Sequence, residues 1–273
     1  VGMTVTSNEI IFVADKNNSR LVLLDIEGKL IKEIHKPVAE GILPEDYKFK
    51  PRKVGVDRLG KIYVISEGEY DGIMVLDSNG EFFGFIGAPR VVPNPLDLFW
   101  SRIATEQQRE RMAIFLPTVY SNIDVDKKGF IYGTISSEES KESIKRLTPS
   151  GDDVLSRFGI HPIIGDIRGD SVFIDVASRN NGNYSVLDQN RGRVFTYNKN
   201  GELLYVFGGR GDLFGEFSIP VAIESSEENI YVLDSGSQNI VEFRPTDYAK
   251  NIHMAIENYD NGEYDKAKKM WDK

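Results

Sequence analysis

The sequence contains no cysteine and only three histidines among its 273 residues. The absence of cysteine excludes a disulfide framework, a thiolate nucleophile and a zinc–thiolate site. It does not indicate a compartment, because extracytoplasmic proteins and bacterial cytosolic proteins both occur without cysteine. The chain therefore offers few of the side chains that nucleophilic and metal chemistry commonly use.

Basic blocks and long apolar runs are also missing. Acidic residues outnumber basic ones by 42 to 33, giving a formal net charge of −9, and no stretch forms a basic stripe. Such a stripe is typical of proteins that bind nucleic acid without sequence preference, so we expect no nucleic-acid partner. No apolar run approaches the roughly 20 residues that a membrane-spanning helix needs, so we expect no membrane span.

What the sequence does contain is a repeated pattern of short alternating strands. The clearest copy is 51–87, where "KVGVD", "KIYVIS", "GIMVLD" and "EFFGFIG" are separated by polar turns and loops. β-Branched and aromatic residues in alternation, with Asn-Gly and Asp/Gly turns between them, predict antiparallel hairpins. Related copies lie at 10–34, 122–159, 171–208 and 219–243.

The length of the repeat, roughly 40 to 50 residues, is typical of the blades of a β-propeller. One four-stranded sheet cannot bury both of its faces alone, whereas radial stacking of neighbouring sheets covers them. We therefore predict an all-β fold, a β-propeller of four-stranded antiparallel blades, over residues 1–245. Five blades are visible, and the fifth ends after its third strand. We expect six in the complete protein, with the missing blade before residue 1.

The segment "FGGRGDLFGEFSIPVAI" at 207–223, followed by "NIYVLDSGSQNIVEF" at 229–243, resembles the NHL repeat. The shared features are a glycine-rich loop between blades, a proline that opens the inner strand, a Tyr-Val-x-Asp strand and a polar turn. The resemblance implies six blades, the usual number for NHL propellers. The chain is also similar to gut Firmicute NHL-repeat proteins, in which an insert with a Phe-Trp pair follows the second copy seen here. The chain is therefore expected to be bacterial.

Residues 88–120 interrupt the strand pattern. Apolar residues at helical spacing, including Phe99 and Trp100, predict one or two helices inserted between blades. Two interpretations stay open. The aromatic pair either anchors the insert on the blades, or the insert forms a wall beside the central channel that Trp100 lines.

The C-terminal residues 246–273 change to a helical pattern. The segment "AIENYDNGEYDKA" is similar to a tetratricopeptide repeat, in which small residues let two antiparallel helices pack closely. We expect the truncated start of a helical-repeat domain here, because one such unit does not make a stable solenoid. A lone helical hairpin is the alternative.

Enzymatic chemistry has little support in the sequence. His35, His161 and His253 all fall outside the predicted inner strands, where some propeller lyases carry their histidines. Gluconolactonase-like propellers hold a divalent metal at the channel, and Asp124, Asp126 and Glu224 could bind Ca²⁺ or another divalent cation there. Aspartate at a strand end more often closes a turn through its own backbone. We therefore predict no cofactor, with a metal-dependent hydrolase or lactonase as the alternative.

The loops that lead into the inner strands converge on the mouth of the channel and can form a recognition surface. Arginine and aromatic side chains on a rigid scaffold are typical of such surfaces. We predict a non-enzymatic binding module that recognises protein or glycan partners through the propeller face and the helical repeats. An extracytoplasmic location is favoured slightly over a cytoplasmic one, and the oligomeric state stays open. The candidate binding residues are Arg52, Arg90, Trp100, Tyr120, Asn122, Arg168 and Arg210.

Overall fold

The computed structural model describes residues 2–39, 42–43, 46–68, 72–88, 119–135, 143–155, 171–179 and 181–272. Statements about structure below refer to these residues. The predicted helices within 88–120 and the candidate residues Arg90, Trp100 and Arg168 lie outside them.

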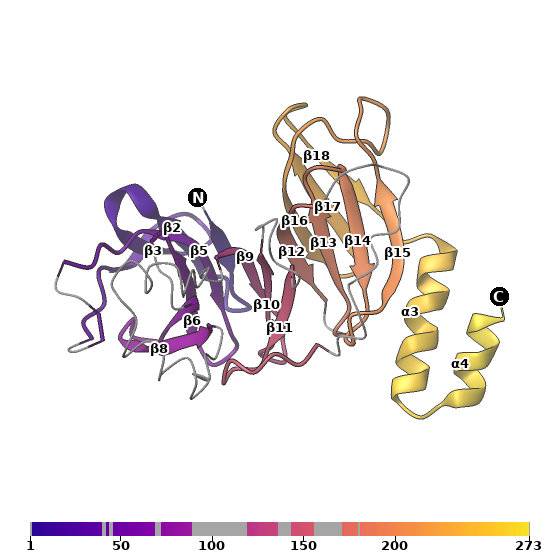
Figure 1. Cartoon of the computed structure of the whole chain (residues 1–273), viewed down its shortest axis with the longest axis horizontal. Coiled ribbons are helices and arrows are strands. Elements are labelled where there is room, and N and C mark those ends of the chain that lie inside the picture. The colour runs from indigo at the N-terminus through magenta and orange to yellow at the C-terminus, as the bar shows by residue number, and fades with distance from the viewer. Residues whose placement is uncertain are drawn as a thin grey trace, which may run out of the picture.

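The described chain forms five antiparallel sheets in sequence order (Figure 1). The first, second and fourth have four strands, and the third and fifth have three described strands. The strands are β1 (Met3–Val5), β2 (Ile11–Asp15), β3 (Arg20–Leu24) and β4 (Leu30–Ile34); β5 (Pro51–Val56), β6 (Ile62–Ser66), β7 (Gly72–Leu76) and β8 (Phe82–Gly87); β9 (Tyr120–Val125), β10 (Ile131–Ile135) and β11 (Ile144–Leu147); β12 (Phe173–Ser178), β13 (Tyr184–Asp188), β14 (Arg193–Tyr197) and β15 (Leu203–Gly208); and β16 (Pro220–Ser226), β17 (Asn229–Asp234) and β18 (Asn239–Phe243).

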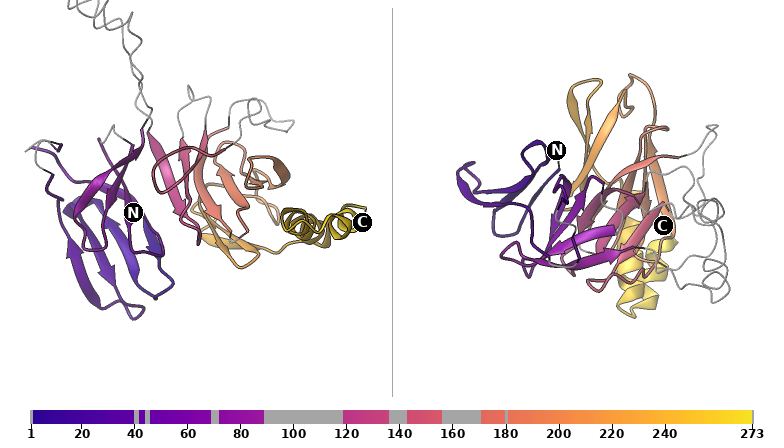
Figure 2. Two further views of the ribbon diagram at one scale, coloured as in Figure 1. Left: turned by 90° about the horizontal axis from the view of Figure 1, so that it is seen from below. Right: turned by 60° about the vertical axis from the view of Figure 1, so that its left-hand side comes forward.

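Each sheet packs on the next through its inner strands. The close contacts run from β1 and β2 to β5, from β5 to β9, from β9 to β12 and from β12 to β16. Figure 2 shows the same sheets from two further directions. This is the architecture of a β-propeller, and the sequence prediction of five meander blades is confirmed.

The core consists of apolar layers between neighbouring blades. Blade 1 and blade 2 share a layer that contains Phe12, Leu21, Val64 and Met74. Equivalent layers follow between blades 2 and 3, 3 and 4, and 4 and 5. Each layer forms because alternate side chains of a strand point to opposite faces of its sheet, and both faces of an inner blade are covered.

The structure extends the predicted first copy by one strand. The sequence pattern placed strands two to four of that copy in 10–34, and β1 (Met3–Val5) adds the inner strand by pairing with β2. The pattern was too short there to be recognised, because only three residues pair. A short 3-10 helix, η1 (Lys16–Asn18), joins β2 to β3.

Two helices follow the fifth blade, α3 (Asp247–Asp260) and α4 (Tyr264–Trp271). Thr246 caps α3 by accepting a hydrogen bond from the backbone N–H of Ala249. Ala255 and Ala267 are fully buried, which lets the two helices pack closely. The predicted helical hairpin is therefore present, and Figure 1 shows α3 beside β15. In the described part of the chain, neither helix is long and apolar enough to cross a membrane.

Candidate functional site

The loop that enters the fifth blade, residues 209–217, is held in a fixed shape by its own hydrogen bonds. The backbone N–H of Phe217 donates to the Gly209 carbonyl at 2.8 Å, and that of Gly211 donates to the Phe217 carbonyl at 3.1 Å. The Glu216 carboxylate accepts from the backbone N–H of Leu213 at 3.1 Å. Phe217 is fully buried and packs edge-to-face on Phe243, so the base of the loop is anchored in the core.

The tip of this loop presents two apolar side chains to solvent. Leu213 is 73% exposed and Phe214 is fully exposed. Scattered apolar residues on a surface are ordinary, but here two adjacent ones stand on a rigid loop. Exposed apolar groups of this kind mark interaction sites. We call residues 209–217 the entry loop.

Arg210 lies at the base of the entry loop, and its Nη1 donates to the Gln189 carbonyl at 2.9 Å. This bond ties the entry loop to the turn at 189–192 of the fourth blade. Arg52 lies in β5, at the corresponding entry to the second blade, and is half-buried. Both arginines therefore occupy the strand-entry side where the sequence placed them, and a role in partner binding stays a prediction.

Tyr120 and Asn122 are buried, which changes the interpretation of these two candidates. Tyr120 is 1% exposed, and its hydroxyl donates to the Gly87 carbonyl of the preceding blade at 2.8 Å. Asn122 is 8% exposed, and its Nδ2 donates to the carboxylate of Asp175 in the next blade. Both side chains join neighbouring blades, so neither is available on the surface as the sequence analysis expected.

Three carboxylates occupy the inner strands of consecutive blades. Asp124 pairs with Tyr132 in β9–β10, and Glu224 occupies the same register position in the fifth blade, where it pairs with Tyr231. Asp175 is on β12 of the blade between them. The inner strands of blades 3, 4 and 5 thus each carry one acidic residue of this cluster.

Three of the six carboxylate oxygens accept hydrogen bonds from a neighbouring blade. Asp175 accepts from Asn122, from its neighbour Val176 at 2.8 Å and from the backbone N–H of Ile223 at 2.8 Å. Asp124 accepts from the backbone N–H of Ser178 at 2.6 Å. These bonds connect blade 3 to blade 4 and blade 4 to blade 5, so the cluster has a structural role.

Burial dominates the ionisation of the cluster. Burial raises the pKa of Asp175 to about 7, against the lowering effect of Lys53 and of the N–H donors from Ile223 and Val176. It also raises the pKa of Glu224 to about 7, with the charges of Asp124 and Asp175 adding to the effect. The pKa of Asp124 is raised by burial as well. Asp124 and Asp175 therefore hold protons more strongly than a carboxyl in water does, and the effect on Glu224 is smaller than its pKa suggests because its side chain is exposed.

The structure does not bring together the three metal candidates as predicted. The Oδ1 of Asp126 accepts from the backbone N–H groups of Lys128 and Phe130, and its Oδ2 accepts from the Tyr132 hydroxyl. It therefore closes the β9–β10 turn, which was the alternative expectation for aspartates at strand ends. Across the described ranges, no group of three or more histidine or acidic side chains is arranged to hold a metal ion.

Asp175 was missed as a member of this cluster. Its signal in the sequence is "FIDVAS", whose register matches that of "YSNIDV" in the preceding repeat and places Asp175 at the position of Asn122. Aligning the inner strands residue by residue would have found it.

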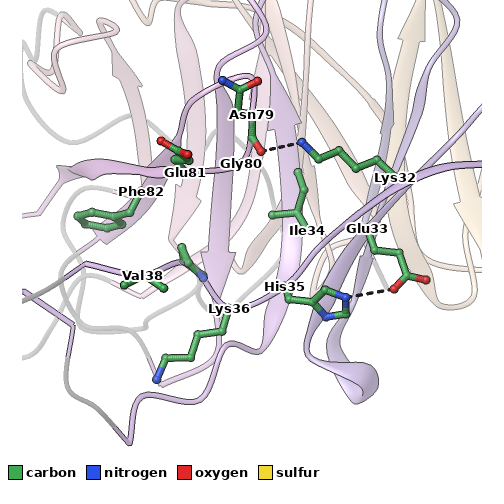
Figure 3. A pocket seen from close by; sticks show the side chains of 11 residues that line it. Lys32, Glu33, Ile34, His35, Lys36, Val38, Asn79, Gly80, Glu81 and Phe82 are labelled. Atoms are coloured by element: carbon green, nitrogen blue, oxygen red, sulfur yellow. Dashed lines mark hydrogen bonds and ion pairs between the residues drawn. The ribbon is translucent and has the colours of Figure 1, made fainter.

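A separate cavity of about 430 Å³ lies at the rim, between β4 and the turn that joins β7 to β8 (Figure 3). Its charged groups are largely engaged with one another. Lys32 donates to the Asn79 carbonyl at 2.8 Å, and the Nε2 of His35 lies 3.2 Å from a Glu33 carboxylate oxygen. Apolar walls come from Ile34 and Phe82, and the cavity is remote from the inner strands.

Comparisons with known proteins agree on the fold. A family model described as "DUF5128: 6-bladed beta-propeller" matches residues 174–273, which include the last two blades and both helices. No curated protein matches the chain in sequence. Among solved structures, a chain in a crystal structure of a nidogen/laminin complex is 14% identical with a TM-score of 0.54, covering 89% of this chain and 75% of that one. Virginiamycin B lyase from Staphylococcus aureus is 13% identical with a TM-score of 0.49, covering 89% and 69%.

Proposed function

We propose that the chain is a non-enzymatic binding module of the NHL-repeat type, which recognises a protein partner through its strand-entry face. The observation that carries the proposal is the entry loop, where Leu213 and Phe214 are exposed on a hydrogen-bonded support. A rigid support lowers the entropy lost on binding, and apolar anchors that enter a partner's pocket commonly dominate binding energy. The fold likeness to a chain of the nidogen/laminin complex is compatible with this proposal but does not carry it.

Arg210 would supply polar contacts beside the apolar tip, and Arg52 would supply them separately at the entry to the second blade. The guanidinium of Arg210 keeps several N–H donors beyond the one directed at Gln189. The helical hairpin, which we interpret as tetratricopeptide-like, would offer a second surface. Tyr248, Tyr259, Tyr264 and Trp271 are each more than half exposed on it.

Binding assays with variants of the entry loop test this function. Candidate partners are extracellular and cell-surface protein fractions and a glycan array, each incubated with the wild-type chain and with Leu213→Ser/Phe214→Ser. We expect a purified protein that binds the wild type to lose at least about tenfold in affinity, or 1.4 kcal/mol, for the double variant. Leu59→Ser is the matched control, because Leu59 is 86% exposed in the turn between β5 and β6, at the opposite end of the strands.

Two outcomes would contradict the proposal. One is a protein partner whose affinity is the same for the wild type and for the double variant. The other is specific glycan binding without any protein partner, which would indicate a glycan-binding module.

The alternative is a divalent cation at the channel that supports hydrolase or lactonase activity. The sequence indicates Asp124, Asp126 and Glu224 as its ligands, but among the described residues no group of three acidic side chains is arranged to hold a metal ion. Thermal unfolding with Ca²⁺, Mn²⁺ or chelator tests it. A midpoint that a chelator lowers and one metal restores would favour this alternative, and the loss of that response in Asp124→Asn would locate the site.

A further inference from the structure

A buried arginine, Arg179, lies at the end of β12, where the charge of Glu228 in the β16–β17 turn of blade 5 acts on it. Arg179 follows β12 directly and is 6% exposed. Its Nη2 donates to the Ser185 hydroxyl at 3.1 Å. Within the described residues, its Nε and Nη1 have no hydrogen-bond partner, while the guanidinium is hydrogen-bonded to the Tyr205 hydroxyl.

Hydroxyl groups and one histidine line the same place. Ser185, Thr196 and Tyr205 are paired across β13, β14 and β15, so their side chains share one face of the fourth blade. The Ser185 and Thr196 hydroxyls are 2.8 Å apart, and the Tyr205 hydroxyl shares a 2.9 Å hydrogen bond with the Nε2 of His253 on α3. Helix α3 thus closes the outer side of a polar cluster.

The pKa shifts of Arg179 and His253 indicate that the cluster lacks a buried negative charge. Burial lowers the pKa of Arg179, and the groups that act against this are Tyr205 and Glu228. Burial and the charge of Arg179 together lower the pKa of His253 to about 4, so His253 is neutral near neutral pH. A buried charge without a partner costs several kcal/mol, and buried N–H donors are normally bonded.

In the described part of the chain, nearby Asn183 also has a buried N–H donor without an acceptor. It is 1% exposed, and its Nδ2 has no hydrogen-bond partner among the described side chains and backbone. Arg179 and Asn183 frame the turn between β12 and β13, where the backbone N–H of Arg179 donates to the Asn183 carbonyl at 2.8 Å. The unmet groups at this turn are therefore all donors.

We propose that Arg179, Ser185, Thr196, Tyr205 and His253 form a binding site for a small oxyanion, either inorganic phosphate or a carboxylate. A guanidinium with neighbouring hydroxyl donors suits the oxygens of such a group. The Arg179 site lies at the ends of the strands opposite the entry loop, so it is independent of the proposed partner surface. A bound anion would also tie α3 to blades 4 and 5.

Titration of the complete chain with phosphate, with acetate and with chloride at equal ionic strength tests the proposal. The readouts are the imidazole NMR signals, which are few because the chain has three histidines, and the unfolding midpoint. We expect phosphate or acetate to shift the His253 signals saturably at concentrations on the order of 1–10 mM. The pKa of His253 should rise by about one pH unit or more, because the anion offsets the charge of Arg179. Chloride should have neither effect.

Phosphate and acetate distinguish the two sources of the oxyanion. Saturation with phosphate alone assigns a phosphate site, and saturation with acetate alone assigns a carboxylate site. Identical, non-saturating responses to all three salts would overturn the proposal.

Variants locate the binding. Arg179→Gln should abolish the saturable shift, and Arg58→Gln, which changes an exposed arginine in the turn between β5 and β6, should retain it. Glu228→Gln should raise the affinity severalfold, because it removes an exposed negative charge beside the site. This variant keeps the test valid if Arg179→Gln does not fold. An unchanged affinity in Glu228→Gln together with an unchanged shift in Arg179→Gln would contradict the assignment.

Discussion

Asp234 illustrates how single residues connect the blades. Its carboxylate accepts backbone N–H donors from Ser218 at 2.7 Å, Ile219 at 2.8 Å and Gly236 at 2.9 Å. Asp188 has the equivalent role in the fourth blade, and the Ser66 hydroxyl has it in the second. In blades 2, 4 and 5 the last residue of the second strand therefore fixes the loop that enters its own blade.

Replacing Asp234 by alanine should destabilise the protein by about 2–4 kcal/mol, because several buried N–H groups would lose their acceptor. Chemical denaturation measures the change. Ser78→Ala is the control, because Ser78 is exposed in the turn between β7 and β8, far from Asp234 in the sequence. Equal stability of the two variants would contradict this role.

The same residue predicts an acid dependence. Burial alone would raise the pKa of Asp234, but the N–H donors of Ile219 and Ser218 lower it to about 2. The lowered pKa means that this contribution to stability is complete above the ordinary value of 3.8 and is lost as the pH falls toward 2. Denaturation of Asp234→Asn should show a weaker pH dependence in that window.

Asp175 predicts the opposite dependence. Its pKa is raised from 3.8 to about 7, so its contribution to stability is complete below 3.8 and is lost as the pH rises through about 7. The loss should be about 4 kcal/mol, since the pKa rises by about three units and each unit corresponds to about 1.4 kcal/mol. In Asp175→Asn this slope should become shallower, with the contributions of Glu224 and Asp124 remaining, whereas Asp212→Asn in the entry loop should leave it unchanged. Denaturation curves between about pH 4 and pH 8 measure both, and an unchanged slope in Asp175→Asn would refute the assignment.

The sequence predicted the role of a residue correctly where that role depends on hydrogen bonds to residues close to it in the chain. The turn role of Asp126 follows from its spacing to Lys128 and Phe130, so it was foreseeable as the common alternative. The burial of Tyr120 and Arg179 depends on contacts with other blades, and a polar residue beside a strand end is indistinguishable from an exposed loop residue in one sequence. Such residues were therefore misplaced or missed.

At the scale of elements, strand periodicity located the blades correctly. The second and fourth copies, 51–87 and 171–208, contain all four of their strands within the predicted bounds. The helical hairpin was predicted from small residues at helical spacing. The position of the hairpin against β15 was not predicted. It depends on the hydrogen bond between Tyr205 and His253, which are far apart in the sequence.

Acid should weaken the docking of α3 on the fourth blade. The pKa of His253 is lowered from 6.5 to about 4, so docking is complete above 6.5 and becomes less favourable as the pH falls toward 4. At pH 5 the loss should be about 2 kcal/mol. Hydrogen exchange of α3 amides, corrected for intrinsic rates, should rise selectively between pH 7 and pH 5. His253→Gln should not show this rise, and exchange in α3 that is equal at both pH values in the wild type would contradict the interpretation.

At the scale of the whole molecule, the first and the last blade each have an uncovered face. In blade 1 the side chains of Met3, Val5 and Leu30 are each more than half exposed, and in blade 5 Leu233 and Ile240 are 43% and 66% exposed. Within the described residues, no close packing joins these two blades. The description of the matched family model as six-bladed agrees with room for a further blade between them.

The 273-residue chain should therefore self-associate through these faces. Sedimentation velocity should show a concentration-dependent mass, and Leu233→Lys/Ile240→Lys should reduce it severalfold because two charges oppose apolar contact. Leu59→Lys, in an exposed turn, is the control. A monomer at all concentrations, or equal association in the two variants, would contradict the prediction.

We propose that the strand-entry face binds a protein partner through the entry loop. Site-specific photo-crosslinking measures directly whether the partner contacts this loop. A photoreactive phenylalanine analogue is placed at position 214, or at the exposed control position 83 on β8, and the partner identified by the binding assay is added in purified form. We expect an efficient crosslink from position 214, which an excess of unlabelled wild-type chain abolishes by competition. The yield of crosslinked product from position 83 should be at least about fivefold lower. Equal crosslinking from both positions, or none from position 214 while the partner is bound, would contradict it.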